Sequence, residues 1–570
     1  MKQWKVIVIL LAIWLCIVLY MTNSVPSGQD AASRTERSLA RALDELDKLQ
    51  KQNKKLQDLM NHLQNNGALK YDSPDTAVEH LEKRLQKANV QLSEIANYSS
   101  NGLTYEEEHA RRKAENTVRE LWYFLEAQLR SLDNGDNKVS KLRKDLEGYR
   151  RTLLDDFSKL RKANKAEDWR MQRSKELHSL VQKRLTYLQN PDNCRSAKKI
   201  SCNLHKGCGF GCQLHHVTYC LIAAYAMKRT LILQSKGWRY SPKGWETFFE
   251  PLSQKCTEDD IKGSITHWKS SRQEMDKYDV IELPIVDNLH PRPDFMPLSV
   301  PADLAPEIAV FHGDPAVWWI GQIVHYLFRL QPPVLTDVVN AGKKMGFRNT
   351  IVGVHVRRTD KINLEAAFHP LEEYMEHVAE FYDQLERTHP GIVRRVYLAT
   401  DDANLLPEAK KKFPNYKFIS DVTISQSAGL GTRYTDSSLR GVIIDIHFLS
   451  RCDFLVCTFS SQVCRVAYEI MQTLHGDAST NFRSLDDVFY YGGQNEHDLI
   501  VVEAHSGNAE GLLDIQVGDA VGIAGNHWNG YSKGMNKRTG VSGLFPSYKA
   551  EDAVVPVEMP TYPEVSRKQR

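Results

Sequence analysis

The sequence predicts a protein of the α/β class, with a helical segment before the α/β region and a small β-barrel after it. Beyond Pro191, short apolar runs typical of strands alternate with longer helical patterns, which indicates βαβ units around a parallel sheet. Before that residue, leucines recur at heptad spacing, as in coiled coils. We therefore expect seven segments: a cytosolic tail (1–5), a membrane anchor (6–21), a coiled-coil stem (22–100), a helical region (101–190), the α/β region (191–498), the barrel (499–556) and a tail (557–570).

The N-terminus carries an uncharged apolar run from Val6 to Met21. This run is close to the minimum of about 17 residues that spans a bilayer. Lys2 and Lys5 precede it and no basic residue follows before Arg34, so the positive-inside rule places the N-terminus in the cytosol. We expect an uncleaved type II anchor, with a cleaved signal peptide, whose apolar core is usually about 7–15 residues, as the alternative. Such a short span suits a thin membrane early in the secretory route.

Composition narrows the possible functions. The 570 residues are 42% hydrophobic, and 74 basic side chains balance 71 acidic ones, so the chain lacks the concentrated basic excess of a general nucleic-acid binder. Six of the ten cysteines fall between Cys194 and Cys256 and three between Cys452 and Cys464. This clustering indicates disulfides and an oxidising compartment.

The stem sequence predicts helices with an apolar seam. Heptad positions from Leu39 to Leu63 are apolar apart from Asn53, and a single asparagine in a seam favours two strands. The spacing resumes from Val78 to Ile95, and two further helical stretches follow before Pro191. A solvated stalk is the alternative, but the recurring seam favours a homodimer. Asn97 begins an N-x-S sequon, a possible glycosylation site.

The strongest chemical signal follows a predicted strand that ends near Val356. It runs His355-Val356-Arg357-Arg358-Thr359-Asp360-Lys361, with Glu365 four residues further on. Two adjacent arginines at a strand end offer planar forks for phosphate oxygens, and Asp360 is placed to hold one fork. A surface cluster of ion pairs is the alternative.

Further polar residues follow other predicted strands, where ligands of parallel sheets bind. Asp401 and Asp402 end one strand, and Ser460-Ser461 stands before a helix, whose N-terminus favours anions. The glycine-rich segment 206–212 lets the backbone approach a ligand, but it lacks the Gly-Lys-[Ser/Thr] of a P-loop. Disulfides are favoured over a zinc site there. Because the chain has no Asp-x-Asp pair to hold a metal, we expect Arg and Lys to balance phosphate charge.

The segments 355–361 (HVRRTDK), 399–402 (ATDD) and 457–470 (CTFSSQVCRVAYEI) resemble the three motifs shared by the α-1,2-, α-1,6- and protein O-fucosyltransferases. The order of anchor, helical stem, cysteine-rich α/β region and C-terminal SH3-like module is similar to that of the α-1,6-fucosyltransferases, over essentially the whole chain. The resemblance implies a Rossmann-like catalytic region of the GT-B type and a Golgi enzyme that uses GDP-β-L-fucose. It also implies inverting transfer of fucose to O6 of the innermost N-acetylglucosamine of N-glycans, without a required metal or other cofactor.

The resemblance also implies roles for single residues. Glu365 matches the general base, Lys361 the cation beside the leaving phosphate, and Arg357 the main phosphate contact. The expected donor-binding residues are His355, Arg357, Arg358, Asp360, Asp445, Ser461, Tyr240, Gly209 and Phe210, the last at a position where relatives have tyrosine. The expected acceptor-binding residues are Asp287, Asp487, Gln494 and His527. The implied disulfides are Cys194–Cys256, Cys202–Cys220, Cys208–Cys212 and Cys457–Cys464, with Cys452 unpaired.

Inverting transfer agrees with the residue types present. A departing diphosphate needs its charge balanced by positioned cations, and a single base suffices to activate the acceptor hydroxyl, an effect of about 10²–10⁴-fold. Two alternatives remain: a protein O-fucosyltransferase, and a non-catalytic lumenal scaffold that binds partners through the coiled coil and the SH3-like module. The intact set of Arg357, Lys361 and Glu365 argues against the scaffold.

The C-terminal segment has the spacing of an SH3 barrel, with Trp528, Pro546 and Tyr548 where a groove for proline-rich peptides would lie. The aromatic pair that normally completes this groove is replaced by Glu503-Ala504-His505-Ser506. We therefore expect the module to pack beside the active site, with His527 near the glycan, rather than to bind proline-rich peptides.

Overall fold

The structure is a computed structural model. It describes residues 99–100, 103–133, 137–163, 166–358, 367–429, 431–507 and 511–565. The predicted anchor, the heptads before residue 99, and Asp360, Lys361 and Glu365 lie outside the described residues. Within the ranges given above, no helix has both the length and the apolar character needed to cross a membrane.

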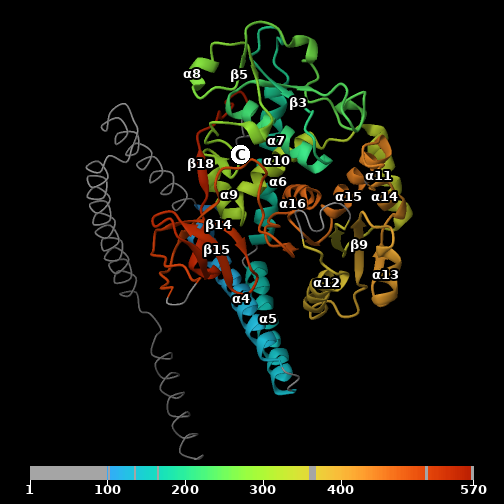
Figure 1. Cartoon of the computed structure of the whole chain (residues 1–570), viewed down its shortest axis with the longest axis vertical. Helices are drawn as coiled ribbons and strands as arrows, with labels where there is room; N and C mark the ends of the chain where they lie inside the picture. The colour runs from blue at the N-terminus through green and yellow to red at the C-terminus, as the bar shows by residue number, and fades with distance from the viewer. Residues whose placement is uncertain are drawn as a thin grey trace, which may run out of the picture. The chain divides into compact units, whose positions relative to one another are not determined.

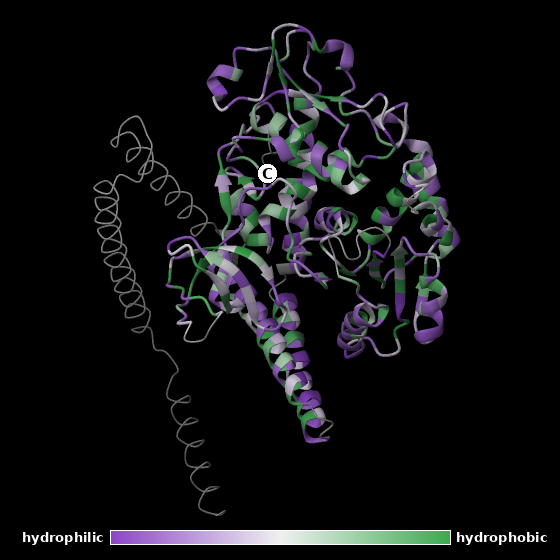
Figure 2. Cartoon of the chain, viewed as in Figure 1, coloured by the Kyte–Doolittle hydropathy of each residue, from purple (hydrophilic) through white to green (hydrophobic). Residues whose placement is uncertain are grey.

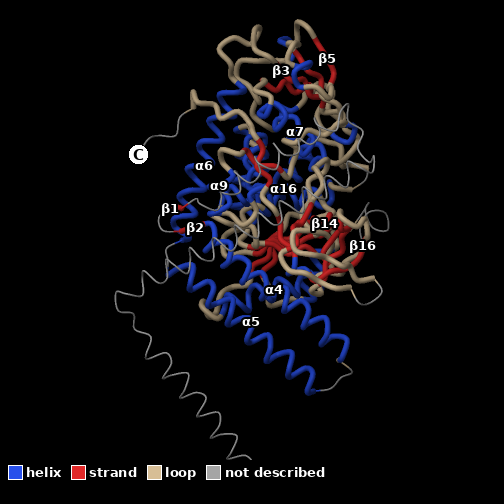
Figure 3. The backbone as a smooth tube through the Cα atoms, turned by 90° about the vertical axis from the view of Figure 1, so that its left-hand side faces the viewer, coloured by secondary structure: helices blue, strands red, loops and turns tan. Residues whose placement is uncertain are grey.

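The helical region begins with a short two-stranded ribbon and continues as three helices. The ribbon is β1 (Ser99–Ser100) with β2 (Leu103–Thr104), and the helices are α4 (Tyr105–Leu132), α5 (Asn137–Ala163) and α6 (Ala166–Gln189). A capping box starts α4, because Thr104 Oγ1 accepts from the Glu107 N–H at 3.1 Å while Glu107 Oε2 accepts from the Thr104 N–H at 3.2 Å. Figure 3 shows α4 and α5 side by side as a long hairpin. The predicted helical character of residues 101–190 is thus present in the described part of that region.

The first half of the α/β region is built on a parallel sheet in the order β4-β3-β6-β5. Helix α7 connects β3 to β4 and is buried on nearly all sides, as its mainly apolar sequence favours. The strands are β3 (Lys199–Asn203), β4 (Thr230–Gln234), β5 (Ile265–His267) and β6 (Val280–Glu282). The helices are α7 (Phe210–Ala226), α8 (Arg272–Met275) and the 3₁₀ turns η1 (Trp245–Thr247), η2 (Glu258–Asp260) and η3 (Val286–Asn288).

Three helices link the two halves: α9 (Ala305–Phe311), α10 (Pro315–Leu327) and α11 (Pro332–Met345). Asp314 caps α10 by accepting from the Val317 N–H at 3.0 Å. Figure 1 shows α7, α10 and α16 between the first sheet, at the top, and the second sheet, at the lower right. In Figure 2 these central helices carry many hydrophobic residues, which agrees with their place in the main core.

The second half contains a five-stranded parallel sheet in the order β10-β9-β8-β11-β12. Its strands are β8 (Val352–Val356), β9 (Arg395–Thr400), β10 (Lys417–Ile419), β11 (Phe454–Cys457) and β12 (Phe482–Ser484). Its helices are α12 (Leu371–Glu386), α13 (Leu405–Lys412), α14 (Val422–Ser427), α15 (Asp436–Leu449) and α16 (Gln462–Leu474). The strand order reverses between β8 and β11, so their carboxyl ends form a topological switch point, where ligands of such sheets bind. The predicted α/β class with parallel sheets is confirmed.

The C-terminal segment forms a separate antiparallel sheet in the order β16-β15-β14-β13-β17. Its elements are β13 (Asp498–Val501), β14 (Ala520–Asn526), β15 (Tyr531–Asn536), β16 (Ser542–Pro546), η4 (Ser547–Lys549) and β17 (Ala550–Asp552). The chain then returns to the α/β region, where β18 (Val555–Val557) pairs in parallel with β7 (Ser299–Pro301). Tyr562, in the segment predicted only as a tail, is buried and donates to the Tyr225 carbonyl at 2.8 Å.

Four disulfides are present, in the pairs that the resemblance implies: Cys194–Cys256, Cys202–Cys220, Cys208–Cys212 and Cys457–Cys464. Cys452 is a free, buried thiol. Two of the disulfides close short loops: the paired cysteines are four positions apart in Cys208–Cys212 and seven positions apart in Cys457–Cys464. Each of these loops contains the start of a helix, α7 or α16.

Candidate active site

The carboxyl end of β8 presents a buried histidine. His355 is 5% exposed, and burial, followed by the charge of Arg357, lowers its pKa to about 4. The ring is therefore neutral at physiological pH. Its Nδ1 is buried without a hydrogen-bond partner among the described residues. A neutral ring with an unused nitrogen at the switch point is suited to hydrogen-bond a ligand.

The two adjacent arginines have different surroundings. Arg357 Nε lies 3.2 Å from Asp401 Oδ2, at the end of β9, and Asp401 Oδ1 accepts from the Arg358 N–H at 2.8 Å. Asp401 thereby orients the fork of Arg357. The Arg358 guanidinium instead lies 3.2 Å from both Asp402 and Glu408. Asp360 was expected to hold one fork; it lies outside the described residues, and the carboxylate found beside Arg357 is Asp401.

The loop after β11 leads into the N-terminus of α16. Ser461 is the N-cap residue, yet its side chain makes no capping hydrogen bond. Asp486, two residues beyond β12, accepts from the backbone N–H groups of Phe459 at 2.8 Å and Ser460 at 3.3 Å. These bonds shape the loop and leave the first turn of α16 without a side-chain cap, which favours an anion there.

A second helix N-terminus meets the first. Gly209 is the N-cap of α7 and likewise provides no side-chain cap. A Cβ atom on Gly211 would lie 3.0 Å from the backbone carbon and the Cβ of Gln462, so a larger residue at position 211 would require α16 to shift. The Phe210 N–H donates to the Tyr240 hydroxyl at 3.0 Å, and burial raises the pKa of Tyr240 to about 12, which keeps it neutral. The N-termini of α7 and α16, which come from the two halves of the α/β region, therefore lie together, and each contributes the partial positive charge of a helix dipole.

Asp445 provides a carboxylate on α15, which packs against β8 and β9. Its Oδ1 accepts from the Tyr397 hydroxyl at 2.7 Å. Burial raises the pKa of Asp445 to about 7, with a further increase from Asp421. The carboxyl group thus changes charge near neutral pH, and when ionised it is an acceptor for paired N–H groups.

The four expected acceptor-binding residues are dispersed. Asp287 forms an ion pair with Lys206 at 2.8 Å, and Gln494 Oε1 accepts from the Tyr491 N–H at 2.5 Å. Asp487 Oδ1 lies 3.7 Å from the position that a Cβ atom on Gly525 would take. Asp487 is therefore beside β14 of the C-terminal sheet. His527 is exposed at the end of that strand. The hydrogen bonds and ion pairs described for Asp287, Asp487 and Gln494 are with other neighbours.

Several site residues were not singled out from the sequence: Asp401 as the partner of Arg357, Asp486, and Gln462. The rule that ligands bind after strands would have drawn attention to Asp486, which follows β12 by two residues. Gln462 and its contacts on α7 depend on tertiary packing, and no local pattern in the sequence indicates them.

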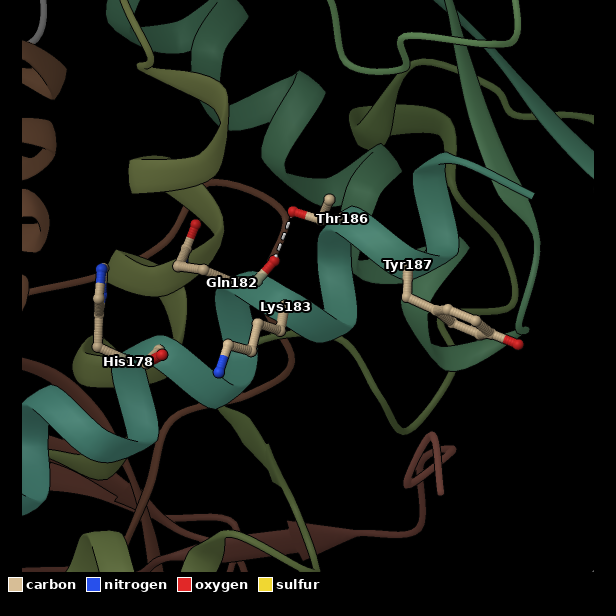
Figure 4. A pocket seen from close by; sticks show the side chains of 6 residues that line it. His178, Gln182, Lys183, Thr186 and Tyr187 are labelled. Carbon is tan, nitrogen blue, oxygen red and sulfur yellow. Dashed lines mark hydrogen bonds between the residues drawn. The ribbon is translucent and has the colours of Figure 1, made fainter. Parts of the chain in front are cut away.

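Two other features of the described residues lie apart from this site. Cys202, His216 and Cys220 are close enough to share a metal ion, but the two cysteines are joined in a disulfide, so their thiolates are not available as ligands. A shallow depression of about 520 Å³ lies along α6 (Figure 4). Its lining comes from that helix alone, with no residue from the strand ends that carry Arg357 or Ser461.

Comparison with known proteins shows the family to which the chain belongs. Residues 1–490 match the model of α-(1,6)-fucosyltransferase N- and catalytic domains. The α-(1,6)-fucosyltransferase of Drosophila melanogaster is 40% identical over 607 residues, which cover 98% of this chain and 97% of that protein. The enzyme of the same name from Caenorhabditis elegans is 37% identical over 557 residues, 94% of this chain and 95% of that one. A crystal structure of the NodZ α-1,6-fucosyltransferase soaked with GDP-fucose matches 48% of this chain and 92% of its own, at 14% identity and a TM-score of 0.29. The chain belongs to the α-(1,6)-fucosyltransferase family.

Proposed function

We propose that this protein transfers L-fucose from GDP-β-L-fucose to O6 of the innermost N-acetylglucosamine of N-glycans, with inversion at the sugar carbon. The observation that carries the proposal is the arrangement at the switch point of the parallel sheet. Arg357 follows β8, and the neighbouring strand β11 leads into the uncapped N-terminus of α16, which lies against the uncapped N-terminus of α7. The match to α-(1,6)-fucosyltransferases along nearly the whole chain supports fucosyl transfer as the reaction at this site.

The diphosphate of the donor binds to Arg357, Ser461 and the N-termini of α7 and α16. Asp401 orients the Arg357 fork, and a planar fork matches two phosphate oxygens at once. The negative charge that develops on the leaving group is stabilised by dipoles and a cation that are already in place, so little reorganisation is needed during the reaction. Metal independence follows as part of the proposal, because Arg357 and Lys361 supply the positive charge.

The chemical step is a single displacement. O6 of the acceptor attacks C1 of fucose while the bond from C1 to the β-phosphate oxygen breaks. The O6 proton passes to Glu365, and the electron pair of the broken bond stays on GDP, beside Lys361. Both residues follow Arg357 within eight positions of the chain.

The guanine is recognised by Asp445 and His355, with Tyr240, Gly209 and Phe210 along the nucleotide. An ionised carboxylate accepts from two neighbouring N–H groups of guanine, a pairing that no other common nucleobase offers in the same form. Tyr240 contributes indirectly, since its hydroxyl holds the Phe210 N–H at the start of α7.

The glycan is bound by Asp287, Asp487, Gln494 and His527, and the C-terminal sheet is an SH3-like module that completes this acceptor site. Its Trp528 is already covered by the chain itself. The ring packs edge-on against Tyr123 of α4 at 5.9 Å, and the Arg483 guanidinium lies 4.6 Å above it. These contacts favour an acceptor-side role over the binding of proline-rich peptides, and so disfavour the scaffold alternative.

The protein is a homodimer that forms through its helical stem and α5. Helix α5 has no fully buried residue, although Leu142, Tyr149, Leu153 and Leu160 form an apolar stripe along it, with Tyr149 72% exposed. Figure 2 shows hydrophobic and hydrophilic residues interleaved along the α4–α5 hairpin. An apolar stripe of this kind is buried when a second copy packs against it. The anchor at residues 6–21 holds the dimer in the Golgi membrane, with the catalytic region in the lumen.

A single assay tests the reaction. The detergent-solubilised full chain is incubated with GDP-fucose, a biantennary N-glycopeptide and EDTA, and any new fucose is located by mass spectrometry and NMR. Fucose in α-linkage on O6 of the innermost N-acetylglucosamine is the expected result. Fucose on a serine or threonine hydroxyl would instead support the protein O-fucosyltransferase, and the absence of transfer to any acceptor would support the scaffold.

A further inference from the structure

A buried polar pair joins the two halves of the α/β region beside the proposed diphosphate site. His215, on α7, is 2% exposed and Glu469, on α16, is 0% exposed. His215 Nε2 lies 3.0 Å from both carboxylate oxygens of Glu469. The two residues are 254 positions apart in the chain, so only the packing of α7 on α16 brings them together.

The other ring nitrogen extends this pair to the start of α16. His215 Nδ1 lies 2.8 Å from Gln462 Oε1. Gln462 and Glu469 are seven residues apart and so share a face of α16, while Gly211 and His215, four apart, share a face of α7. Because Gly211 touches Gln462 directly, the interface is continuous from the helix N-termini to the buried pair.

We propose that His215 and Glu469 are positioning residues for the donor diphosphate: they fix the side chain of Gln462 and, through it, the placement of the two helix N-termini. Glu469 orients the imidazole, and the imidazole engages Gln462 Oε1, which leaves the Gln462 amide N–H groups available to a ligand beside Ser461. Gln462 is partly exposed, and its Nε2 has no hydrogen-bond partner among the described residues. The inference rests on the proposed function in one respect, namely that GDP-fucose binds at these helix N-termini.

Neighbouring contacts hold the helices together without the pair. A side chain at Gly321 of α10 would clash with the Glu469 carbonyl, which shows how closely α10 and α16 pack. The Tyr491 hydroxyl donates to the His215 carbonyl, and Arg465 donates to the Tyr490 carbonyl at 2.6 Å. Apolar residues of similar size commonly replace a buried ion pair without loss of stability. The specific effect of His215 and Glu469 is therefore on the orientation of Gln462.

The test removes both members at once, because a lone buried carboxylate would destabilise the fold. The full-length double variant His215→Phe with Glu469→Met is expected to fold with a thermal midpoint close to that of the unmodified protein. Its GDP dissociation constant should rise at least about tenfold by calorimetry. The KM for GDP-fucose should rise by a similar factor, with a smaller change in kcat at saturating donor. An unchanged dissociation constant in the folded double variant would overturn the inference.

Two single variants complete the test. Gln462→Met should raise the GDP dissociation constant about as much as the double variant, and combining the three changes should add little more. Gln472→Met is the matched control, since Gln472 contacts the buried His312 at 3.0 Å near the other end of α16. It should leave GDP affinity within twofold. If the double variant does not fold, the Gln462→Met variant tests the proposal alone. Unaltered GDP affinity in that variant contradicts the proposal.

The unmodified protein separates this inference from the proposed function. If it binds GDP and transfers fucose while every variant binds GDP equally well, only the positioning role is refuted. If the unmodified protein neither binds GDP nor transfers fucose, the proposed function itself fails.

Discussion

Replacing Arg357 by lysine tests the diphosphate site most directly. Asp401 lies 3.2 Å from Arg357 Nε and sets the plane of the guanidinium. Lysine keeps the positive charge but has a single nitrogen, so it cannot contact Asp401 and two phosphate oxygens in the same geometry. A hydrogen bond to a charged group contributes about 1.5–3 kcal/mol, and losing one therefore weakens GDP binding by about 10- to 150-fold. Turnover should fall by roughly 10²–10³, the usual effect of removing one preorganised donor.

Arg387→Lys is the control for this variant, because it makes the same change at an arginine outside the proposed site. Arg387 directly follows α12, and its Nε lies 2.5 Å from Asp155 Oδ2. Its replacement should lower the thermal midpoint slightly and leave GDP affinity within about threefold of the unmodified protein. Calorimetry with GDP and initial-rate kinetics with GDP-fucose are measured on both variants. The reasoning is refuted if Arg357→Lys binds GDP normally, or if both variants lose affinity to the same extent.

Three further predictions concern the base, the guanine contact and the dimer. Glu365→Gln should lower turnover at least about a hundredfold and keep GDP affinity, because the amide retains the shape of the side chain but cannot take the acceptor proton. Because burial raises the pKa of Asp445 to about 7 and guanine binds its ionised form, GDP affinity should decrease as pH falls from 8 to 6. Asp445→Asn should bind GDP weakly at all pH values and lose this dependence. Replacing Leu142, Tyr149 and Leu153 by serine should convert the dimer to a monomer in sedimentation experiments, since it removes the exposed stripe of α5.

Each of these predictions has an outcome that contradicts it. Retained turnover in Glu365→Gln would remove that residue from the mechanism, and lost GDP affinity would make it a structural partner of the phosphate-binding segment. A flat pH profile for GDP binding to the unmodified protein would exclude Asp445 as the guanine contact. An unchanged sedimentation profile of the α5 variant, alongside a Lys144→Ser control on the same helix, would place the dimer interface elsewhere or show that there is none.

The sequence allowed the architecture to be predicted where a local pattern determines it. The apolar run before Arg357 became β8, and the periodic apolar residues of 372–386 lie in α12, because burial of one face is encoded in the spacing itself. The rule for parallel sheets drew attention to His355, Arg357 and Ser461, and the structure places them at the end of β8 and at the N-cap of α16. The pairing of the cysteines did not follow from their spacing and came only from the resemblance.

Contacts between distant segments were beyond such reasoning. Nothing near Arg357 in the sequence distinguishes it from Arg358, and the difference arises because β9 brings Asp401 to one side chain while Asp402 and Glu408 engage the other. Likewise, His215 lies in a mainly apolar helix, where the sequence does not distinguish it from any other buried histidine that has hydrogen-bond partners. Its contact with Gln462 could therefore not be predicted. These distinctions depend on the order of the strands and on helix packing, which no local pattern in a single sequence encodes.

The pairing of β18 with β7 has a consequence for how the protein is made. Residues from 555 onward complete an interaction with residues near 300, and Tyr562 reaches Tyr225 still earlier in the chain. Synthesis proceeds from the N-terminus, so the strands of the first half of the α/β region emerge long before β18. This half can be completed only after the last residues have been synthesised. During that interval β7 has no strand partner among the described residues, and its open edge is available to chaperones or to neighbouring chains. A nascent chain released shortly before Val555 would contain every residue of the proposed active site and still lack the strand that finishes its first half.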